Sequence, residues 1–338
     1  MKARFRAALT IGNVSVFLLG LILIVPTLYV PPVWNDWIFR ISMLLLLSVS
    51  WNLMASTGLI SLGHAGFWGV GTYAALLCGN KYGLPLIVVL IPATLCGALL
   101  GVLLAVATGR LRGVYFAICT LAMAEGLRVS ALMLPKITGG AAGIFLRPEL
   151  RPSLNVLCFI ATCVATLSVA IAQYLTHTPF YYACRAIRNH ETAAQMLGID
   201  PRRYRMVVLA LSGAMTSAGG GIGAWYGGYL DPMVAFSFMI TVQSQIAPIL
   251  GGMYSVAGAV LGSGVIIALQ EATRIWFGDQ EGVSQLVFGC ILVFGILFMP
   301  QGVYGLILRA WKNIDENRQM RGSPKAAPAQ NMNAGERK

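Results

Sequence analysis

Long runs of apolar residues, separated by short polar segments, dominate this 338-residue sequence. Two of them, 84–107 and 154–175, contain no charged residue. A helix that crosses the core of a bilayer needs about 20 such residues, and it satisfies its backbone hydrogen bonds within the segment. The runs are continuous and lack the alternation of membrane β-strands. The sequence therefore predicts an all-α polytopic membrane protein.

Composition supports this fold class. The sequence is 57% hydrophobic and 11% charged, whereas an average soluble domain has about 25% charged residues. The third and eighth apolar segments are short and rich in glycine, so we expect short or re-entrant helices there. A window of about 19 residues predicts about ten transmembrane segments, near 8–30, 38–56, 65–79, 84–107, 113–134, 154–175, 206–226, 236–250, 256–276 and 285–299.

The basic residues predict the topology. Lys2, Arg4 and Arg6 precede an apolar run that is too long for a cleaved signal peptide, so we expect a retained first helix. If the N-terminus lies inside, most of the 24 lysines and arginines also lie inside, as the positive-inside rule requires. We expect a multi-pass protein of the bacterial plasma (inner) membrane with both termini in the cytoplasm. The net charge of +12 then reflects topology and lipid contacts, not nucleic acid.

Two regions follow from the change in composition along the chain. Residues 1–308 form the predicted transmembrane domain, and 177–205 is a polar loop within it. Residues 309–338 form a cytoplasmic tail, which loses its apolar period and is expected to be disordered from about residue 318.

The polar loop has the pattern of a helix, a turn and a second helix. Gly198 suits the position after a helix end, and Asp200 followed by Pro201 suits the start of the next helix. Met196 and Cys184 lie toward the polar face, where a partner could cover them; the alternative is a helix that lies on lipid headgroups. The predicted apolar face consists of Ala183, Ala186, Ile187, His190, Ala193, Ala194 and Leu197, and we expect it to pack on the rest of the chain.

Four ordered motifs resemble one known family. Glu191-Thr-Ala193-Ala194, followed by Gly198, resembles the EAA loop of ABC importer permeases. The other motifs are Ser61-Leu-Gly63-His64-Ala-Gly66-Phe67, Arg110-Leu-Arg112-Gly113 with the helix that follows it, and Thr138-Gly139-Gly140 with Gly143. Over roughly residues 45–305, the chain is similar to the branched-chain amino acid ABC transporter permease family, LivM type.

The resemblance implies a permease subunit that translocates a small polar solute, most simply a branched-chain or related amino acid. It implies a second homologous permease, two cytoplasmic ABC ATPases and an external or periplasmic solute-binding protein as partners. ATP and Mg would be bound by the ATPases, because this sequence contains no G-x-x-x-x-G-K-[ST] motif; we expect no cofactor and no catalytic residue in this chain. A urea or amide importer permease, or a stand-alone secondary transporter or channel, stays open as an alternative. The residues expected to couple to the ATPase are Arg185, Arg188, Glu191, Ala193, Ala194, Met196 and Gly198.

The two short glycine-rich segments are expected to border the translocation pathway, because interrupted helices often line one. Gly219 to Gly223 are expected to serve close helix packing instead. Ser61, Thr120, Thr138 and Thr241 could offer hydrogen bonds, and His64 either packs or contacts solute. The predicted pathway residues are Ser61, Gly63, His64, Gly66, Phe67, Thr120, Gly251 and Gly252.

Two acidic residues inside predicted spans each have an arginine three residues later. Glu125 with Arg128, and Glu271 with Arg274, would lie on one helix face and neutralise each other. They serve either a gate or helix packing. The seven cysteines include no C-x-x-C pair, and the chain has only three histidines, so the sequence predicts no metal site.

Overall fold

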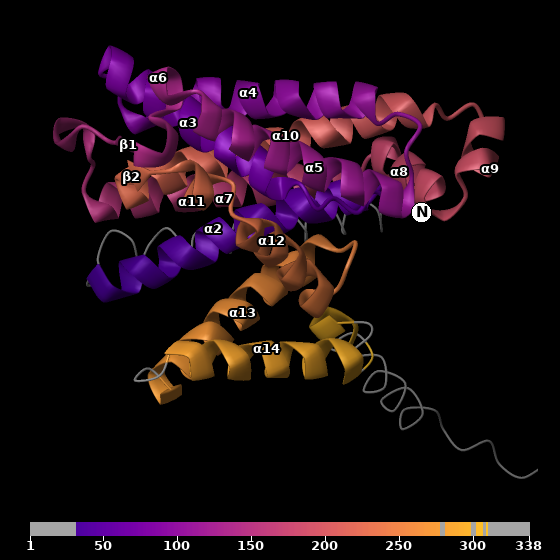
Figure 1. Cartoon of the computed structure of the whole chain (residues 1–338). Helices are drawn as coiled ribbons and strands as arrows, with labels where there is room; N and C mark the ends of the chain where they lie inside the picture. Colours follow the sequence, from indigo (N-terminus) through magenta and orange to yellow (C-terminus); the bar gives the residue numbers. More distant parts are fainter. Residues whose placement is uncertain (1–31, 278–280, 299–301, 307–308, 310–338) are drawn as a thin grey trace, which may run out of the picture.

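Helices form nearly all the regular structure of the protein in the computed structural model, which describes residues 32–277, 281–298, 302–306 and 309 (Figure 1). The all-α prediction is confirmed. The predicted first span and the predicted disordered tail lie outside the described residues.

The long helices follow the predicted spans closely. Seven helical segments of the described part are long and apolar enough to cross a membrane, so the chain is a multi-pass membrane protein. The short third segment forms a helix of 19 residues. The long helices are α2 (Pro32–Ala55), α3 (His64–Tyr82), α4 (Leu86–Ala107), α5 (Gly113–Met133), α7 (Leu154–Thr176), α10 (Pro201–Gly227), α12 (Phe238–Gly251), α13 (Val256–Phe277) and α14 (Glu281–Phe298).

Glycines bring α10 close to its neighbours α3 and α4. A Cβ added to Gly97 of α4 would lie 2.4 Å from the carbonyl oxygen of Gly213, and one added to Gly71 of α3 would lie 2.1 Å from that of Ser217. Only a residue without a side chain fits such backbone contacts. A Cβ on Gly220 would meet the Trp68 carbonyl oxygen at 2.2 Å. The predicted packing role of the α10 glycines is therefore confirmed.

Glycines also allow close backbone contact between α12 and α13. A Cβ on Gly251 would lie 1.9 Å from the Gly258 carbonyl oxygen, and one on Gly262 would lie 1.9 Å from that of Ala247. In Figure 1, α12 to α14 lie below the layer that α3, α4 and α10 form. Serines reinforce the contact with α2, since Ser263 donates a hydrogen bond of 3.2 Å to Ser48.

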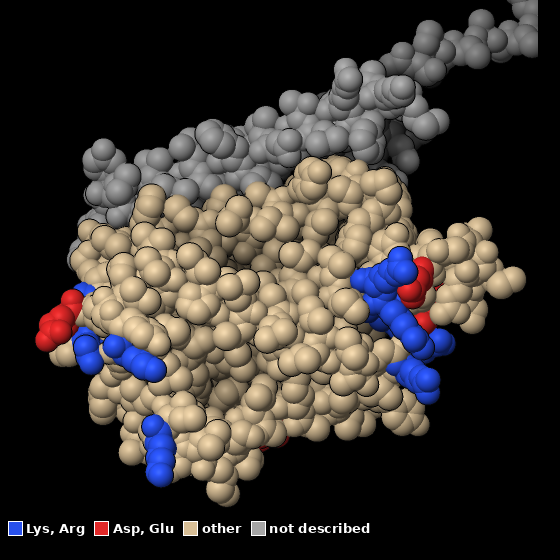
Figure 2. Space-filling view, turned by 90° about the horizontal axis from the view of Figure 1, so that it is seen from above, with Lys and Arg blue, Asp and Glu red and all other residues tan. Residues whose placement is uncertain are grey.

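The bundle has two polar ends. One end carries α8 (Pro179–Asn189) and α9 (Glu191–Met196). The opposite end carries α6 (Pro135–Thr138), α11 (Pro232–Ala235) and the antiparallel strands β1 (Ile144–Phe145) and β2 (Tyr229–Leu230), together with the 3-10 turns η1 (Gly140–Ala142) and η2 (Pro148–Leu150). On the face drawn in Figure 2, charged side chains gather at opposite ends and leave an uncharged band between them. This pattern suits a bundle whose middle lies in lipid.

The α12–α13 contact predicts a matched pair of variants. Gly262→Ala should destabilise the protein in detergent by about 1–3 kcal/mol, because its Cβ would overlap a backbone oxygen. Gly264→Ala, two residues along the same helix, meets no other described residue within 4 Å and should be neutral or stabilising. Thermal unfolding of both purified variants checks this. Equal unfolding temperatures would contradict the packing account.

Candidate functional site

The polar loop folds as a helix, a turn and a helix, with one break that the sequence did not predict. His190 has extended backbone angles, φ −150° and ψ 95°, and separates α8 from α9. The predicted turn and cap are confirmed: Gly198 has φ +81°, and the Asp200 carboxylate accepts a hydrogen bond of 3.0 Å from the Arg202 backbone N–H. Pro201 begins α10.

The break at His190 changes which side chains face inward. Ala183, Ile187 and Ala194 are buried as predicted, but Leu197 is 79% exposed. His190 and Ala193 are exposed as well, and Ala186 is half-buried. The prediction of one continuous apolar face is therefore wrong for His190, Ala193 and Leu197, because α9 starts in a new direction after the extended residue.

Cys184 was predicted on the polar face, and this is wrong. Its side chain is fully buried in an apolar cluster with Met54, Phe116 and Val208. Burial raises the pKa of the Cys184 thiol to about 12, so the thiol stays protonated and unreactive near neutral pH.

Glu191 holds the loop to two other parts of the chain. Its carboxylate accepts hydrogen bonds of 3.3 and 2.9 Å from the Arg205 guanidinium of α10. Arg112, at the turn before α5, lies 3.1 Å from the same carboxylate. The side chains of Glu191 and Arg205 are only 14% and 10% exposed. Glu191 therefore points into the chain, and its expected role in coupling to an ATPase stays a prediction.

A second set of contacts joins α8 to the turn between α12 and α13. The Arg188 guanidinium carbon lies 3.8 Å from the centre of the Tyr254 ring, a cation–π contact. The Tyr181 hydroxyl donates a hydrogen bond of 2.8 Å to the Tyr254 carbonyl oxygen, and burial raises the pKa of that hydroxyl. Tyr254 has φ +65°, and its N–H donates to Asn52 at the end of α2. Tyr254 was not singled out from the sequence. Its position two residues after Gly252, in a predicted pathway segment, could have indicated it.

The predicted pathway residues fall into two groups. In the first group, the Leu62 N–H donates to the Thr120 hydroxyl at 3.0 Å, and the Gly63 N–H donates to the Ser61 hydroxyl at 3.1 Å. A Cβ on Gly63 would lie 2.4 Å from the Thr120 carbonyl oxygen. The Ala65 N–H donates to Thr241 of α12 at 2.9 Å. Ser61, Thr120 and Thr241 thus bond backbone groups of this chain, and Thr138 does the same at the other end of α5.

His64 belongs to the same buried group. Its Nε2 atom lies 3.3 Å from the Ser212 hydroxyl of α10, and its ring meets Phe67 edge-on at a centroid distance of 5.9 Å. Gly66 lies against Met123 and Ala124. The second group, Gly251 and Gly252, lies apart at the α12–α13 turn beside Tyr254.

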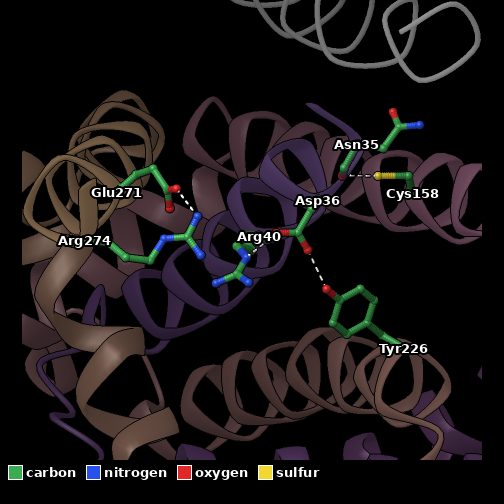
Figure 3. A network of polar contacts seen from close by, with 7 residues as sticks. All are labelled: Asn35, Asp36, Arg40, Cys158, Tyr226, Glu271 and Arg274. Carbon is green, nitrogen blue, oxygen red and sulfur yellow. Dashed lines mark hydrogen bonds and ion pairs between the residues drawn. The ribbon is translucent and has the colours of Figure 1, made fainter. Parts of the chain in front are cut away.

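Both predicted ion pairs are present. Arg128 lies 2.7 Å from the Glu125 carboxylate and also donates to the Met233 sulfur, and Arg274 pairs with Glu271. A third pair, missed because Asp36 precedes the predicted second span, joins Arg40 to Asp36 at 2.8 Å. Figure 3 shows the Tyr226 hydroxyl donating to the same Asp36 carboxylate, and the pair of Glu271 and Arg274 beside Arg40. Within the described ranges, no group of three His, Cys, Asp or Glu side chains could hold a metal.

Comparison with known proteins identifies the family. Residues 34–296 match the family described as branched-chain amino acid transport system / permease component. The chain belongs to this family. It is 29% identical to the high-affinity branched-chain amino acid transport system permease protein LivM of Escherichia coli, over 73% of this chain and 64% of that relative.

Other relatives match more narrowly. The permease is 27% identical to the Escherichia coli permease protein LivH over 45% of this chain and 48% of the relative. It is 28% identical to the probable LivH of Methanocaldococcus jannaschii over 54% of this chain and 59% of the relative. The chain thus spans less than two thirds of the length of these curated relatives. No solved structure matches it.

The loop of the permease leaves a small apolar surface uncovered. We name it the α9 tip: Thr192, Ala193, Gln195, Met196 and Leu197, all exposed. Met196 is 89% exposed, although it lies on a loop that is bonded firmly to the bundle. Gly198 leaves open space beside the tip, and Arg185 is exposed on the neighbouring α8. Met196 and Leu197 are the large apolar side chains of this surface, and both project from a loop held by the ion pairs of Glu191.

The ion pairs of Glu191 predict a second matched pair of variants. Arg205→Gln leaves the buried carboxylate with Arg112 alone, so α9 should be destabilised by about 2 kcal/mol. Hydrogen exchange of the α9 amides should then quicken by about thirtyfold. Arg203→Gln is the control, because Arg203 is 86% exposed and, within the described residues, pairs only with Asp200 at 3.4 Å. Unchanged exchange in Arg205→Gln would contradict the anchoring role of Glu191.

Proposed function

We propose that this permease is the membrane subunit of an ATP-driven ABC importer and that the α9 tip receives the motion of a partner ATPase. The observation that carries the proposal is the combination of an exposed apolar tip with buried anchors behind it. Met196 is 89% exposed, while Glu191, five residues earlier, is held by two arginines. A displacement of the tip would therefore move the helices to which it is bonded.

The contacts of Glu191 and Arg188 connect the loop to three other parts of the chain. Arg205 lies in α10, Arg112 lies at the turn before α5, and Tyr254 lies at the turn between α12 and α13. The helix α10 contacts α3 and α4 through backbone, so it would carry the motion through the bundle as a rigid body. Tyr254 would carry it to α12, whose Thr241 bonds the start of α3. A single displacement of the α9 tip would thus move both short glycine-rich helices, α3 and α12.

The partners and orientation belong to the same proposal. The α9 tip faces the cytoplasm, because Arg110, Arg112, Arg185, Arg188 and the arginines at the start of α10 lie at that end of the bundle. Two ABC ATPases bind ATP and Mg there, and this chain supplies no cofactor. A second homologous permease completes the membrane part. An external or periplasmic binding protein delivers solute at the opposite end, in a bacterial inner membrane.

The solute follows from the names of the relatives, which are branched-chain amino acid transport permeases. We therefore propose leucine, isoleucine and valine, or related amino acids, ahead of urea and amides. A secondary transporter acting alone would need carboxylates free to bind a coupling ion. Glu125, Glu271 and Asp36 each pair with an arginine instead.

Met196→Glu tests the coupling surface. The side chain makes no inward contact that the change would disturb, so the permease should insert and fold normally. Assembly with the ATPases and ATP-driven leucine uptake should fall by at least about tenfold, since a charge would enter a desolvated interface. Both are measured on the complex purified in mild detergent and reconstituted in liposomes.

Two controls accompany this variant. Met196→Leu keeps an apolar tip and should retain uptake, and Ile137→Glu places the same charge on a 57% exposed residue at the opposite end. Wild-type uptake by Met196→Glu would refute the coupling surface. Uptake by the purified chain alone, without ATP, would favour the stand-alone transporter.

A further inference from the structure

A cavity of about 300 Å³ lies among α2, α3, α10, α12 and α13. Its apolar wall includes Phe39, Met43 and Trp68, and its polar groups are Arg40, Gln243 and Gln270. The two short glycine-rich helices both reach it, α3 through Trp68 and α12 through Gln243. The size is at the small end of the range for ligand pockets, about 300–1,000 Å³.

The cavity lies in the half of the bundle away from the α9 tip. The segment just after α2 reaches the loop, because a Cβ on Gly58 would lie 3.4 Å from the Arg188 Cα atom. Asp36 and Arg40 lie in the first turns of α2, so they are far from the loop. Tyr226 at the end of α10 and Gln270 near the end of α13 line the same region.

In the described part of the chain, one charged residue, Arg40, is in the lining of this cavity, and the carboxylates of Asp36 and Glu271 lie outside the lining. Arg40 lines it and pairs with Asp36, which also accepts a hydrogen bond from Tyr226 (Figure 3). Glu271 follows the lining residue Gln270 and pairs with Arg274. These pairs leave each guanidinium with further N–H donors and each carboxylate with further acceptor positions. Within the lining itself, a ligand carboxylate would find N–H donors on Arg40, and an ammonium group would find the amide oxygens of Gln243 and Gln270.

The glutamines are the groups that packing does not explain. Among the described residues, neither the Gln243 nor the Gln270 side chain has a hydrogen-bond partner, although both are half-buried and line the cavity. Because neither amide is bonded within the described part of the chain, both are free to bond a water or a ligand in the cavity. An amide can donate to a carboxylate and accept from an ammonium group.

We propose that this cavity binds the transported solute as a zwitterionic amino acid with a short aliphatic side chain. Arg40 and the amides of Gln243 and Gln270 contact its charged groups, and Phe39, Met43 and Trp68 enclose its side chain. Trp68 is held in place because Gly223 leaves no side chain beneath it: an added Cβ would lie 2.6 Å from the indole ring. The proposal rests on the proposed function for its choice of solute, and on the cavity for its residues.

The first test is transport by the complete importer, reconstituted with its ATPases, second permease and binding protein. Gln243→Leu with Gln270→Leu keeps the volume of both side chains and removes the polar groups. Leucine uptake should fall by at least about tenfold, because the carboxylate and ammonium group lose hydrogen bonds. Assembly of the complex and the ATPase rate stimulated by loaded binding protein should stay within about twofold of the parent. Gln173→Leu, in α7 outside the cavity, is the matched control and should transport normally.

The second test measures occupancy and does not depend on transport. In a cysteine-free version of the assembled complex, Gln270→Cys should react with a small thiol reagent, and L-leucine should slow the reaction by at least about fivefold. Isocaproate, which lacks the ammonium group, should protect far less. Protection of Gln270→Cys by leucine also tests the cavity assignment if the variant with both glutamines replaced fails to assemble.

The outcomes separate the two proposals. Parent-level uptake by the assembled double variant, or labelling of the Gln270→Cys complex that leucine does not slow, would overturn the cavity assignment. A parent complex that assembles and hydrolyses ATP but moves no leucine would overturn the proposed solute instead. Normal uptake by the control with loss in the double variant supports the cavity.

Discussion

The backbone contacts of α10 are the constraint on which the rest of this permease depends. Helices in lipid gain little from burying apolar surface, so close van der Waals packing and small residues hold them together. Gly97, Gly213 and Gly220 bring α10 within backbone distance of α3 and α4. A helix packed in this way cannot bend or slide by small amounts without overlap of atoms. It can move only together with its neighbours, as one body.

This helix connects the two regions that matter for the proposed transport. Arg205, one turn into α10, holds Glu191 of the loop. Tyr226, at the other end of α10, bonds Asp36 and lines the proposed solute cavity. A force on the α9 tip would therefore reach the cavity through a single packed element. The contact of Arg188 with Tyr254 provides a parallel route through α12.

The sequence predicted the elements well and their orientation poorly. Hydropathy located the spans because lipid imposes a length on every crossing helix, and Asp200 and Pro201 marked the start of α10 because their chemistry is local. The inward direction of Glu191 depends on the break at His190 and on Arg205, 14 residues away, which no local pattern reveals. Asp36 was missed because it precedes the predicted second span, and its bond to Tyr226, 190 residues further along the chain, has no local pattern either.

In the proposed mechanism, Glu191 anchors the loop internally while the α9 tip meets the ATPase. Photo-crosslinking from single positions in the intact complex tests both halves at once. A photoreactive amino acid at Met196, 89% exposed, should yield an adduct with the ATPase, and the same group at Ala194, 2% exposed, should yield none. Absence of an ATPase adduct at Met196 in an assembled, active complex would contradict the account, as would equal adduct yields at the two positions.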